Sequence, residues 1–254
     1  MKYQLGLTLA KGKLITPLSL AATAVFTAVV CVATMVFSVY VPATQGFFNI
    51  GESMVFLSAI LFGPFVGGIA GGVGSALADL LLGFWYYAPA TFIIKGFEGA
   101  IVGALKQKSP NFGSKLHWRI FTIILGFVIG LLLFWIGSAY YSGEIELTLG
   151  SNLFILYIPT LFWLFLGVVT AFSIMLLGLL ANPEFGWTIF SVIVGGLVMV
   201  TGYFIYQRFF IYPLFNMEVV AIAEIPVNIG QMIIGAIVAL PIVKVILRAF
   251  PYMK

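Results

Sequence analysis

Long apolar runs separated by short polar segments make up most of the chain. Clear runs occupy residues 16–41, 88–105, 118–139, 153–181, 187–207 and 219–247. Because a helix needs about 20 apolar residues to cross a bilayer, each of these runs predicts a transmembrane helix.

The stretch 47–84 is long enough for two short helices, and Gly63-Pro64 lies near its middle. This dipeptide predicts either a turn or a kink in one long helix. Lysine and arginine collect on the cytoplasmic side of membrane proteins, and a turn places nearly all loop cations on one side. These cations are Lys2, Lys11, Lys13, Lys106, Lys108, Lys115, Arg119, Lys244, Arg248 and Lys254.

A turn at Gly63-Pro64 therefore gives about eight transmembrane helices, with both termini in the cytoplasm. The loop that carries Glu144 and Glu146 then lies outside, and Arg208 is the one misplaced loop cation. We expect an all-α, polytopic membrane helix bundle that forms a single membrane domain over residues 1–254.

Composition agrees with a membrane protein and excludes several other classes. Hydrophobic residues make up 62% of the chain and charged residues 8%, so a soluble fold could not hide the apolar surface. The basic residues lie in short segments between apolar runs, which is a topology signal and not a nucleic-acid surface. Cys31 is the single cysteine, so there is no disulfide framework. The first run is too long for a signal-peptide core, which predicts a retained helix.

Enzymatic motifs are absent from the sequence. It has no zinc-binding His-Glu-x-x-His motif, no Gly-x-Ser-x-Gly motif and no nucleotide-binding loop. His117 is the one histidine. We therefore expect no catalytic activity, no metal and no cofactor, and any uphill transport must draw energy from a partner or an ion gradient.

Small residues recur every four positions in the segment 66–83. One series is Gly67, Gly71, Ser75 and Asp79, and a second is Gly68, Gly72 and Ala76. Small residues at this spacing let helix backbones approach closely in lipid, which predicts a tightly packed helix. Ala24 and Ala28 make a similar step in the first run.

Five ionisable residues lie inside or at the edges of the apolar runs: Glu52, Asp79, Lys95, Glu98 and Glu224. A charge in the hydrocarbon layer is costly unless it faces a cavity or a partner, so each is a candidate for a functional site. Lys95 and Glu98 are three residues apart and can pair on one helix face. That pair could also be purely structural.

Most of these groups fall near the external ends of their helices in the eight-helix topology, which predicts a pocket open to the outside. Glu224, Asn228 and Gln231 form one polar stripe on the last helix. The expected binding residues are Asn49, Glu52, Asp79, Tyr86, Lys95, Tyr203, Glu224, Asn228 and Gln231. We expect a neutral polar ligand, and an interfacial aromatic belt is the alternative role for Tyr86.

Several segments resemble the substrate-binding S components of energy-coupling-factor (ECF) vitamin transporters, and the riboflavin-type subgroup in particular. They are Asn49-Ile-Gly-Glu52, Phe62-Gly-Pro-Phe65, Ala78-Asp79-Leu80, Ala88-Pro-Ala-Thr-Phe-Ile-Ile-Lys-Gly-Phe-Glu-Gly99, Gly202-Tyr-Phe204 and Ala223-Glu-Ile-Pro-Val-Asn228 followed by Gln231. The resemblance covers residues 16–106 and 190–248. Residues 112–186 then form an inserted helix pair between the fourth and fifth helices of a six-helix core.

The resemblance implies a membrane-embedded binding subunit for a vitamin or vitamin precursor of riboflavin, pyrimidine or pyridoxine type. It also implies a transmembrane coupling subunit and two ATPase subunits as partners, with delivery by tilting of the whole binding subunit in the membrane. Ala24 and Ala28 are then expected to contact the coupling subunit.

Two other functions stay open on the sequence alone. A self-sufficient ion-coupled carrier of a small polar metabolite could use Asp79, Glu98 or Glu224 as a proton site, although such carriers often contain inverted repeats and none is evident here. A structural or assembly protein of the membrane would bind no small molecule.

Overall fold

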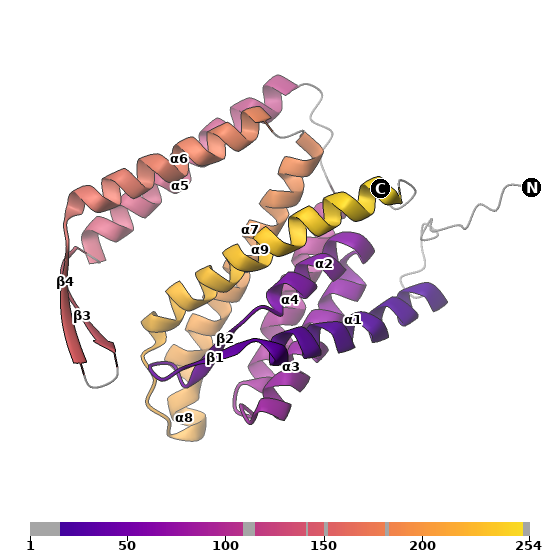
Figure 1. The fold of residues 1–254 in the computed structure, drawn as a ribbon, viewed down its shortest axis with the longest axis horizontal. Helices are drawn as coiled ribbons and strands as arrows, with labels where there is room; N and C mark the ends of the chain where they lie inside the picture. The colour runs from indigo at the N-terminus through magenta and orange to yellow at the C-terminus, as the bar shows by residue number, and fades with distance from the viewer. Residues whose placement is uncertain (1–15, 109–114, 141, 150–151, 181–182, 251–254) are drawn as a thin grey trace, which may run out of the picture. The chain divides into compact units, whose positions relative to one another are not determined.

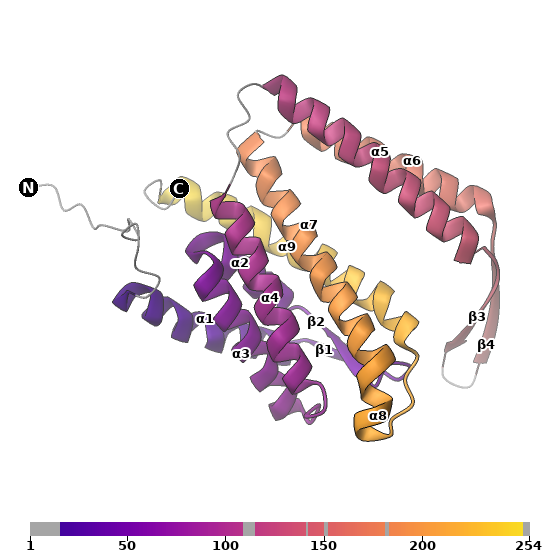
Figure 2. The same ribbon diagram turned by 180° about the vertical axis from the view of Figure 1, so that it is seen from behind.

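The computed structural model describes residues 16–108, 115–140, 142–149, 152–180 and 183–250 (Figures 1 and 2). The chain divides into two compact units. Unit 1 comprises residues 1–109 and 187–254, and unit 2 comprises residues 110–186. Lys2, Lys11, Lys13 and Lys254, which were predicted to lie on the cytoplasmic side, are outside the described residues.

Unit 1 is a bundle of helices with one short β-hairpin. Its elements in chain order are α1 (Pro17–Val36), β1 (Ser38–Val41), β2 (Gly46–Asn49), α2 (Glu52–Phe62), α3 (Pro64–Leu82), α4 (Ala88–Gln107), α7 (Pro183–Tyr206, which enters the unit at Trp187), the π-helix η1 (Gln207–Ile211), α8 (Tyr212–Phe215), the 3-10 helix η2 (Ala221–Ala223) and α9 (Glu224–Ala249).

The predicted turn at Gly63-Pro64 is confirmed. Gly63 has a φ of 86°, a left-handed conformation that favours glycine, and Pro64 begins α3. Helices α2 and α3 then pack closely, since a Cβ atom built on Gly67 would lie 2.6 Å from the Cα atom of Ala59. The stretch 47–84 therefore forms two helices, preceded by a strand.

The predicted close packing of the glycine-rich helix is also confirmed, and its main neighbour is α4. A Cβ atom built on Gly72 would lie 2.6 Å from the carbonyl oxygen of Phe92, and one built on Gly68 would lie 3.1 Å from that of Gly96. Backbones at this separation leave no room for larger side chains.

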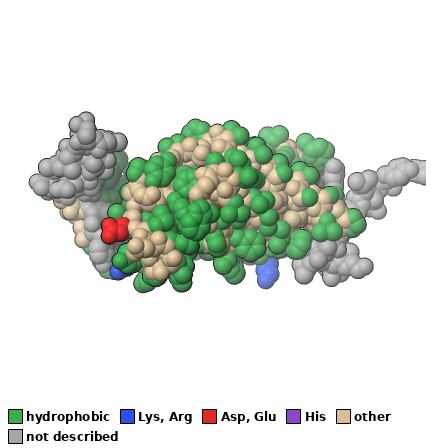
Figure 3. All heavy atoms as spheres, turned by 90° about the horizontal axis from the view of Figure 1, so that it is seen from below, with side chains coloured by type: hydrophobic (Ala, Val, Ile, Leu, Met, Phe, Trp, Pro, Cys, Tyr) green, Lys and Arg blue, Asp and Glu red, His purple; other side chains and the backbone are tan. Residues whose placement is uncertain are grey.

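The rest of the unit 1 interior consists of two apolar clusters. Phe56, Val102, Val192 and Ala239 join α2, α4, α7 and α9. Tyr87, Ile94, Met199, Tyr203 and Ile211 join the start of α4 to α7 and η1. Outward-facing positions are also apolar, and the face shown in Figure 3 carries few charged side chains. This surface suits lipid and not water.

Unit 2 is a helical hairpin whose two helices are joined by a two-stranded sheet. Helix α5 (Lys115–Tyr140) runs beside α6 (Thr160–Leu180), and between them β3 (Gly143–Leu149) pairs antiparallel with β4 (Asn152–Ile158) (Figure 1). The helices touch backbone to backbone, because a Cβ atom built on Gly130 would lie 2.6 Å from the carbonyl oxygen of Gly167.

The fold is a polytopic helical membrane bundle, as predicted. Within the described residues, 6 helices are long and apolar enough to cross a membrane, and the shorter apolar helices are Glu52–Phe62 and 160–176. The predicted helices over 16–41 and 153–181 are partly wrong, because the chain forms β1 after Val36 and β4 before Thr160. Hydropathy alone does not separate a short apolar strand from a helical turn.

Candidate functional site

Polar side chains of unit 1 gather at one end of the helix bundle. Asp79 lies near the C-terminal end of α3, Lys95 about two turns into α4, Tyr203 near the C-terminal end of α7, and Glu224 at the start of α9. Because α3 and α7 end where α4 and α9 begin, the four side chains come together.

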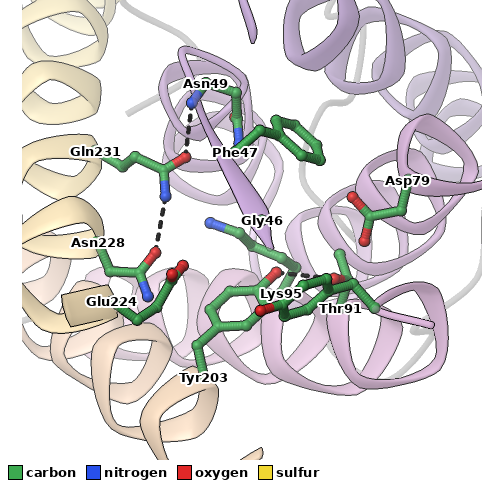
Figure 4. Close-up of a pocket in the computed structure, with 11 residues that line it drawn as sticks. Gly46, Phe47, Asn49, Asp79, Thr91, Lys95, Tyr203, Glu224, Asn228 and Gln231 are labelled. Atoms are coloured by element: carbon green, nitrogen blue, oxygen red, sulfur yellow. Dashed lines mark hydrogen bonds between the residues drawn. The ribbon is translucent and has the colours of Figure 1, made fainter. Parts of the chain in front are cut away.

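These side chains surround a cavity of about 30 Å³, which has room for about two water molecules (Figure 4). Its wall comes from β2, α3, α4, α7 and α9. The lining residues are Gly46, Phe47, Asn49, Asp79, Tyr87, Thr91, Lys95, Tyr203, Glu224, Asn228 and Gln231.

The β1–β2 hairpin supplies part of the wall and is tied down by hydrogen bonds. The backbone N–H of Asn49 donates to Oε1 of Gln231 over 2.9 Å, and the Tyr87 hydroxyl donates to the carbonyl of Thr44 over 2.7 Å. Gln207 Nε2 donates to the Tyr87 hydroxyl over 2.7 Å. Burial raises the pKa of Tyr87, so its phenol stays neutral and keeps donating.

A buried cluster of three charged groups lies beside the cavity. The Lys95 ammonium donates a hydrogen bond to Glu52, and its Nζ lies 3.1 Å from Oε2 of Glu98. Lys95 is 4% exposed and both carboxylates are buried. The predicted Lys95–Glu98 pair is confirmed, and Glu52 is an additional partner that sequence spacing did not predict.

The polar stripe of α9 faces the cavity along its length. Gln231 Nε2 donates to Oδ1 of Asn228 over 2.8 Å, and Glu224 lies beside them (Figure 4). The side-chain atoms Asn228 Nδ2 and Glu224 Oε2 are buried without a hydrogen-bond partner among the described residues, as is Oδ2 of Asp79 on α3. Buried polar atoms are normally paired, so these atoms are free to meet a ligand.

Seven of the nine predicted site residues line this one cavity. The two that do not are Glu52, which pairs with Lys95, and Tyr86. The Tyr86 hydroxyl donates to the carbonyl of Gln45 over 2.7 Å, so this side chain holds the hairpin and is not part of the cavity wall. Whether the lining residues bind a ligand stays a prediction.

Four lining residues were not among the predicted ones: Gly46, Phe47, Tyr87 and Thr91. Gly46 and Phe47 were missed because no strand was predicted there. Thr91 lies four residues before Lys95, so the same helical face could have indicated it. The Thr91 Oγ1 atom accepts a hydrogen bond of 2.9 Å from the Tyr203 hydroxyl.

Outside the cavity, Ala24 and Ala28 are exposed on α1. Among the described residues, no group of three or more His, Cys, Asp or Glu side chains could hold a metal ion.

Two comparisons with known proteins bear on this site. Residues 15–152, slightly more than half of the chain, match the family described as "ECF-type riboflavin transporter, S component". The match runs from α1 through the α3 and α4 parts of the cavity and into unit 2 as far as residue 152; α7 and α9 lie beyond it. An uncharacterized protein encoded in the gap 3' region of Pyrococcus woesei is 48% identical over 101 residues. The aligned region covers 40% of this chain and 62% of the length of that protein.

Proposed function

The chain belongs to the S component family of ECF-type riboflavin transporters, and on that basis we propose that it binds a vitamin or vitamin precursor of riboflavin, pyrimidine or pyridoxine type in the cavity of unit 1. This family consists of transporter subunits and not enzymes. The observation that carries the proposal is the group of buried, unpartnered polar atoms aimed into one cavity at one end of the bundle.

The charge distribution of unit 1 supports an external position for the cavity. Lys106, Lys244 and Arg248 lie toward the C-terminal ends of α4 and α9, whereas the cavity lies near the N-terminal ends of the same helices. Cationic ends face the cytoplasm in membrane proteins. The cavity therefore opens to the outside, and both termini lie in the cytoplasm.

The proposed partners are a transmembrane coupling subunit and two ATPase subunits, which supply the energy for delivery by tilting of the bound S component. The exposed pair Ala24 and Ala28 supports α1 as the contact for the coupling subunit, because small residues let another helix approach closely. The cavity of about 30 Å³ is smaller than a vitamin, so it must enlarge when a vitamin binds. The helix pair of residues 112–186 is proposed to be an insertion in the S-component core of residues 16–106 and 190–248.

The test of binding uses a change in the cavity wall that spares the fold. Replacing Asn228 with Leu removes an Nδ2 donor that has no hydrogen-bond partner among the described residues, so we expect weaker ligand binding by about 1–3 kcal/mol and little change in melting temperature. The small molecule that co-purifies with the wild-type protein is identified by mass spectrometry, and its affinity for both proteins is measured by calorimetry.

The matched control is Gln107→Leu, which changes an exposed amide near the C-terminal end of α4. This variant should keep wild-type affinity. Wild-type affinity in a well-folded Asn228→Leu protein would remove α9 from the site. If the wild-type protein neither carries nor binds any vitamin-like molecule, the proposed function is wrong and a structural role in the membrane is favoured.

A further inference from the structure

The acids and bases buried in unit 1 are strongly unequal in number. Among its described residues, the buried Asp, Glu, Lys, Arg and His side chains are the carboxyl groups of Glu52, Asp79, Glu98 and Glu224 and the single ammonium of Lys95. If all are ionised, four negative charges face one positive charge. Such an excess is costly in a desolvated interior unless a positive charge from elsewhere joins it.

The single ammonium is already used by the protein. Lys95 is bonded to Glu52 and lies 3.1 Å from Glu98, so two carboxylates neutralise it before any ligand arrives. Lys95 is therefore a poor partner for an anionic ligand. Sequence spacing predicted Glu98 as a partner of the lysine, and Glu52 is the second acid that holds it.

Two carboxyl groups are left over, and both line the cavity. Asp79 comes from α3 and Glu224 from α9, and Figure 4 shows them on opposite sides of the cavity. Asp79 is 4% exposed and Glu224 5% exposed. Asp79 Oδ2 and Glu224 Oε2 have no hydrogen-bond partner among the described residues. Two carboxylates that face each other across a cavity can each accept a hydrogen bond from one cationic group.

The neutral groups of the wall do not supply that charge. Asn228 and Gln231 bond to one another, and Gln231 also accepts from the backbone of Asn49. The hydroxyl of Tyr203 donates to Thr91. None of these contacts brings a positive charge to Asp79 or Glu224.

We infer that the cavity takes a positively charged, nitrogen-containing ligand, whose N–H donors meet Asp79 and Glu224 from opposite sides. This inference rests on the proposed function and narrows it, since vitamins and their precursors include both neutral and cationic molecules. A hydrogen bond to an ionised group is stronger than one between neutral groups, so charge should dominate the choice of ligand.

The test compares probes that have nearly the same shape and differ in charge. Guanidinium and urea are small, planar and similar in size, and pyridoxamine differs from pyridoxine by an aminomethyl group in place of a hydroxymethyl group. Binding of all four to the purified full-length protein is measured by calorimetry and by thermal unfolding at low millimolar concentrations and constant ionic strength.

The expected result is that the cationic member of at least one pair binds about 10-fold or more tightly than its neutral counterpart. Equal or tighter binding of the neutral members would overturn the inference. A failure of both cations to bind would also overturn it.

The isosteric variants Asp79→Asn and Glu224→Gln locate the effect. Each removes one charge while keeping the shape of the side chain, so the preference for the cation should fall by about 10-fold. Glu218→Gln changes an exposed carboxylate in the segment before η2 and should leave the preference unchanged. An unchanged preference in both cavity variants would contradict the assignment, whatever their melting temperatures.

The outcomes of this experiment can be distinguished from those of the test of the proposed function. A neutral vitamin that co-purifies with the protein would leave the proposed function in place and overturn the charge assignment. Absence of any vitamin-like ligand would overturn the proposed function, while the guanidinium and urea measurement would still report the charge of the cavity.

Discussion

At the scale of single residues, Lys95 holds together acids from two helices. It joins Glu52 at the start of α2 to Glu98 on its own helix, and all three side chains are withdrawn from solvent. Breaking a buried ion pair by removing one partner is far more costly than replacing all partners, because it leaves an uncompensated charge. The cluster should therefore matter more for folding than for ligand contact.

Replacing Lys95 with Met should lower the free energy of unfolding by about 3–5 kcal/mol, because Glu52 and Glu98 lose their counter-ion. The combined variant with Glu52→Gln and Glu98→Gln should recover a large part of the loss, since no unpaired charge remains. Melting temperatures in detergent measure both effects, and Lys108→Met, an exposed lysine at the end of α4, serves as the control. A stable Lys95→Met protein with lost ligand affinity would instead assign the lysine to binding.

At the scale of elements, helices α3 and α4 pack closely because glycines at particular positions let their backbones touch. A Cβ atom built on Gly72 would lie 2.6 Å from the Phe92 carbonyl oxygen, which cannot move without shifting α4. Gly96 lies in the same interface, yet its nearest neighbour would be 3.6 Å away, an ordinary contact distance. The two glycines therefore differ in what they tolerate.

Gly72→Ala should lower the melting temperature because it pushes α4 and its cavity residues away from α3. Gly96→Ala, the matched control, should be tolerated and could raise stability slightly through its better helix propensity. Thermal unfolding of both variants in the same detergent provides the comparison. If the two variants melt alike, the α3–α4 distance is less restrictive than the structure indicates.

The elements also show what the sequence could predict. Apolar runs predicted the membrane helices because length and hydropathy are properties of a segment by itself. The turn at Gly63 followed from its Gly-Pro dipeptide and the distribution of lysines. The strand that ends at Asn49 was missed, since a four-residue apolar strand leaves no periodic signal distinct from a helix end. For the same reason, Gly46 and Phe47 were not predicted as residues of the site.

For the site itself, spacing within one helix carried the prediction. The stripe of Glu224, Asn228 and Gln231 and the Lys95–Glu98 pair are contacts between turns of the same helix, so the 3.6-residue period predicted them. The Glu52–Lys95 contact joins positions 43 residues apart. It depends on how α2 packs against α4, which no pattern along the chain contains.

At the scale of the whole molecule, the chain consists of two units of different character. Unit 1 contains the cavity and the helices that line it, whereas unit 2 is a helical hairpin with a two-stranded sheet. The family match covers α1 to α4 and continues to residue 152, so the family accounts for part of both units. The assignment of residues 112–186 as an insertion stays a prediction.

Two energy sources for transport are to be compared. Membership of the family favours ATP hydrolysis by partner subunits, whereas the buried acids of unit 1 would suit an ion gradient. A binding subunit moves its ligand when a coupling subunit and ATPases act on it, whereas an ion-coupled carrier would move protons through Asp79, Glu98 or Glu224. The two accounts agree on the cavity and disagree on whether this chain transports alone.

The most direct test is uptake by the purified chain in liposomes, with the small molecule that co-purifies with it as the probe. We predict binding without uptake when the chain is reconstituted alone, under either a proton or a sodium gradient. Uptake should appear when the coupling subunit and both ATPases are added and ATP is supplied on the side of the membrane where the ATPases lie. Uptake driven by an ion gradient in the absence of partner subunits would contradict the account.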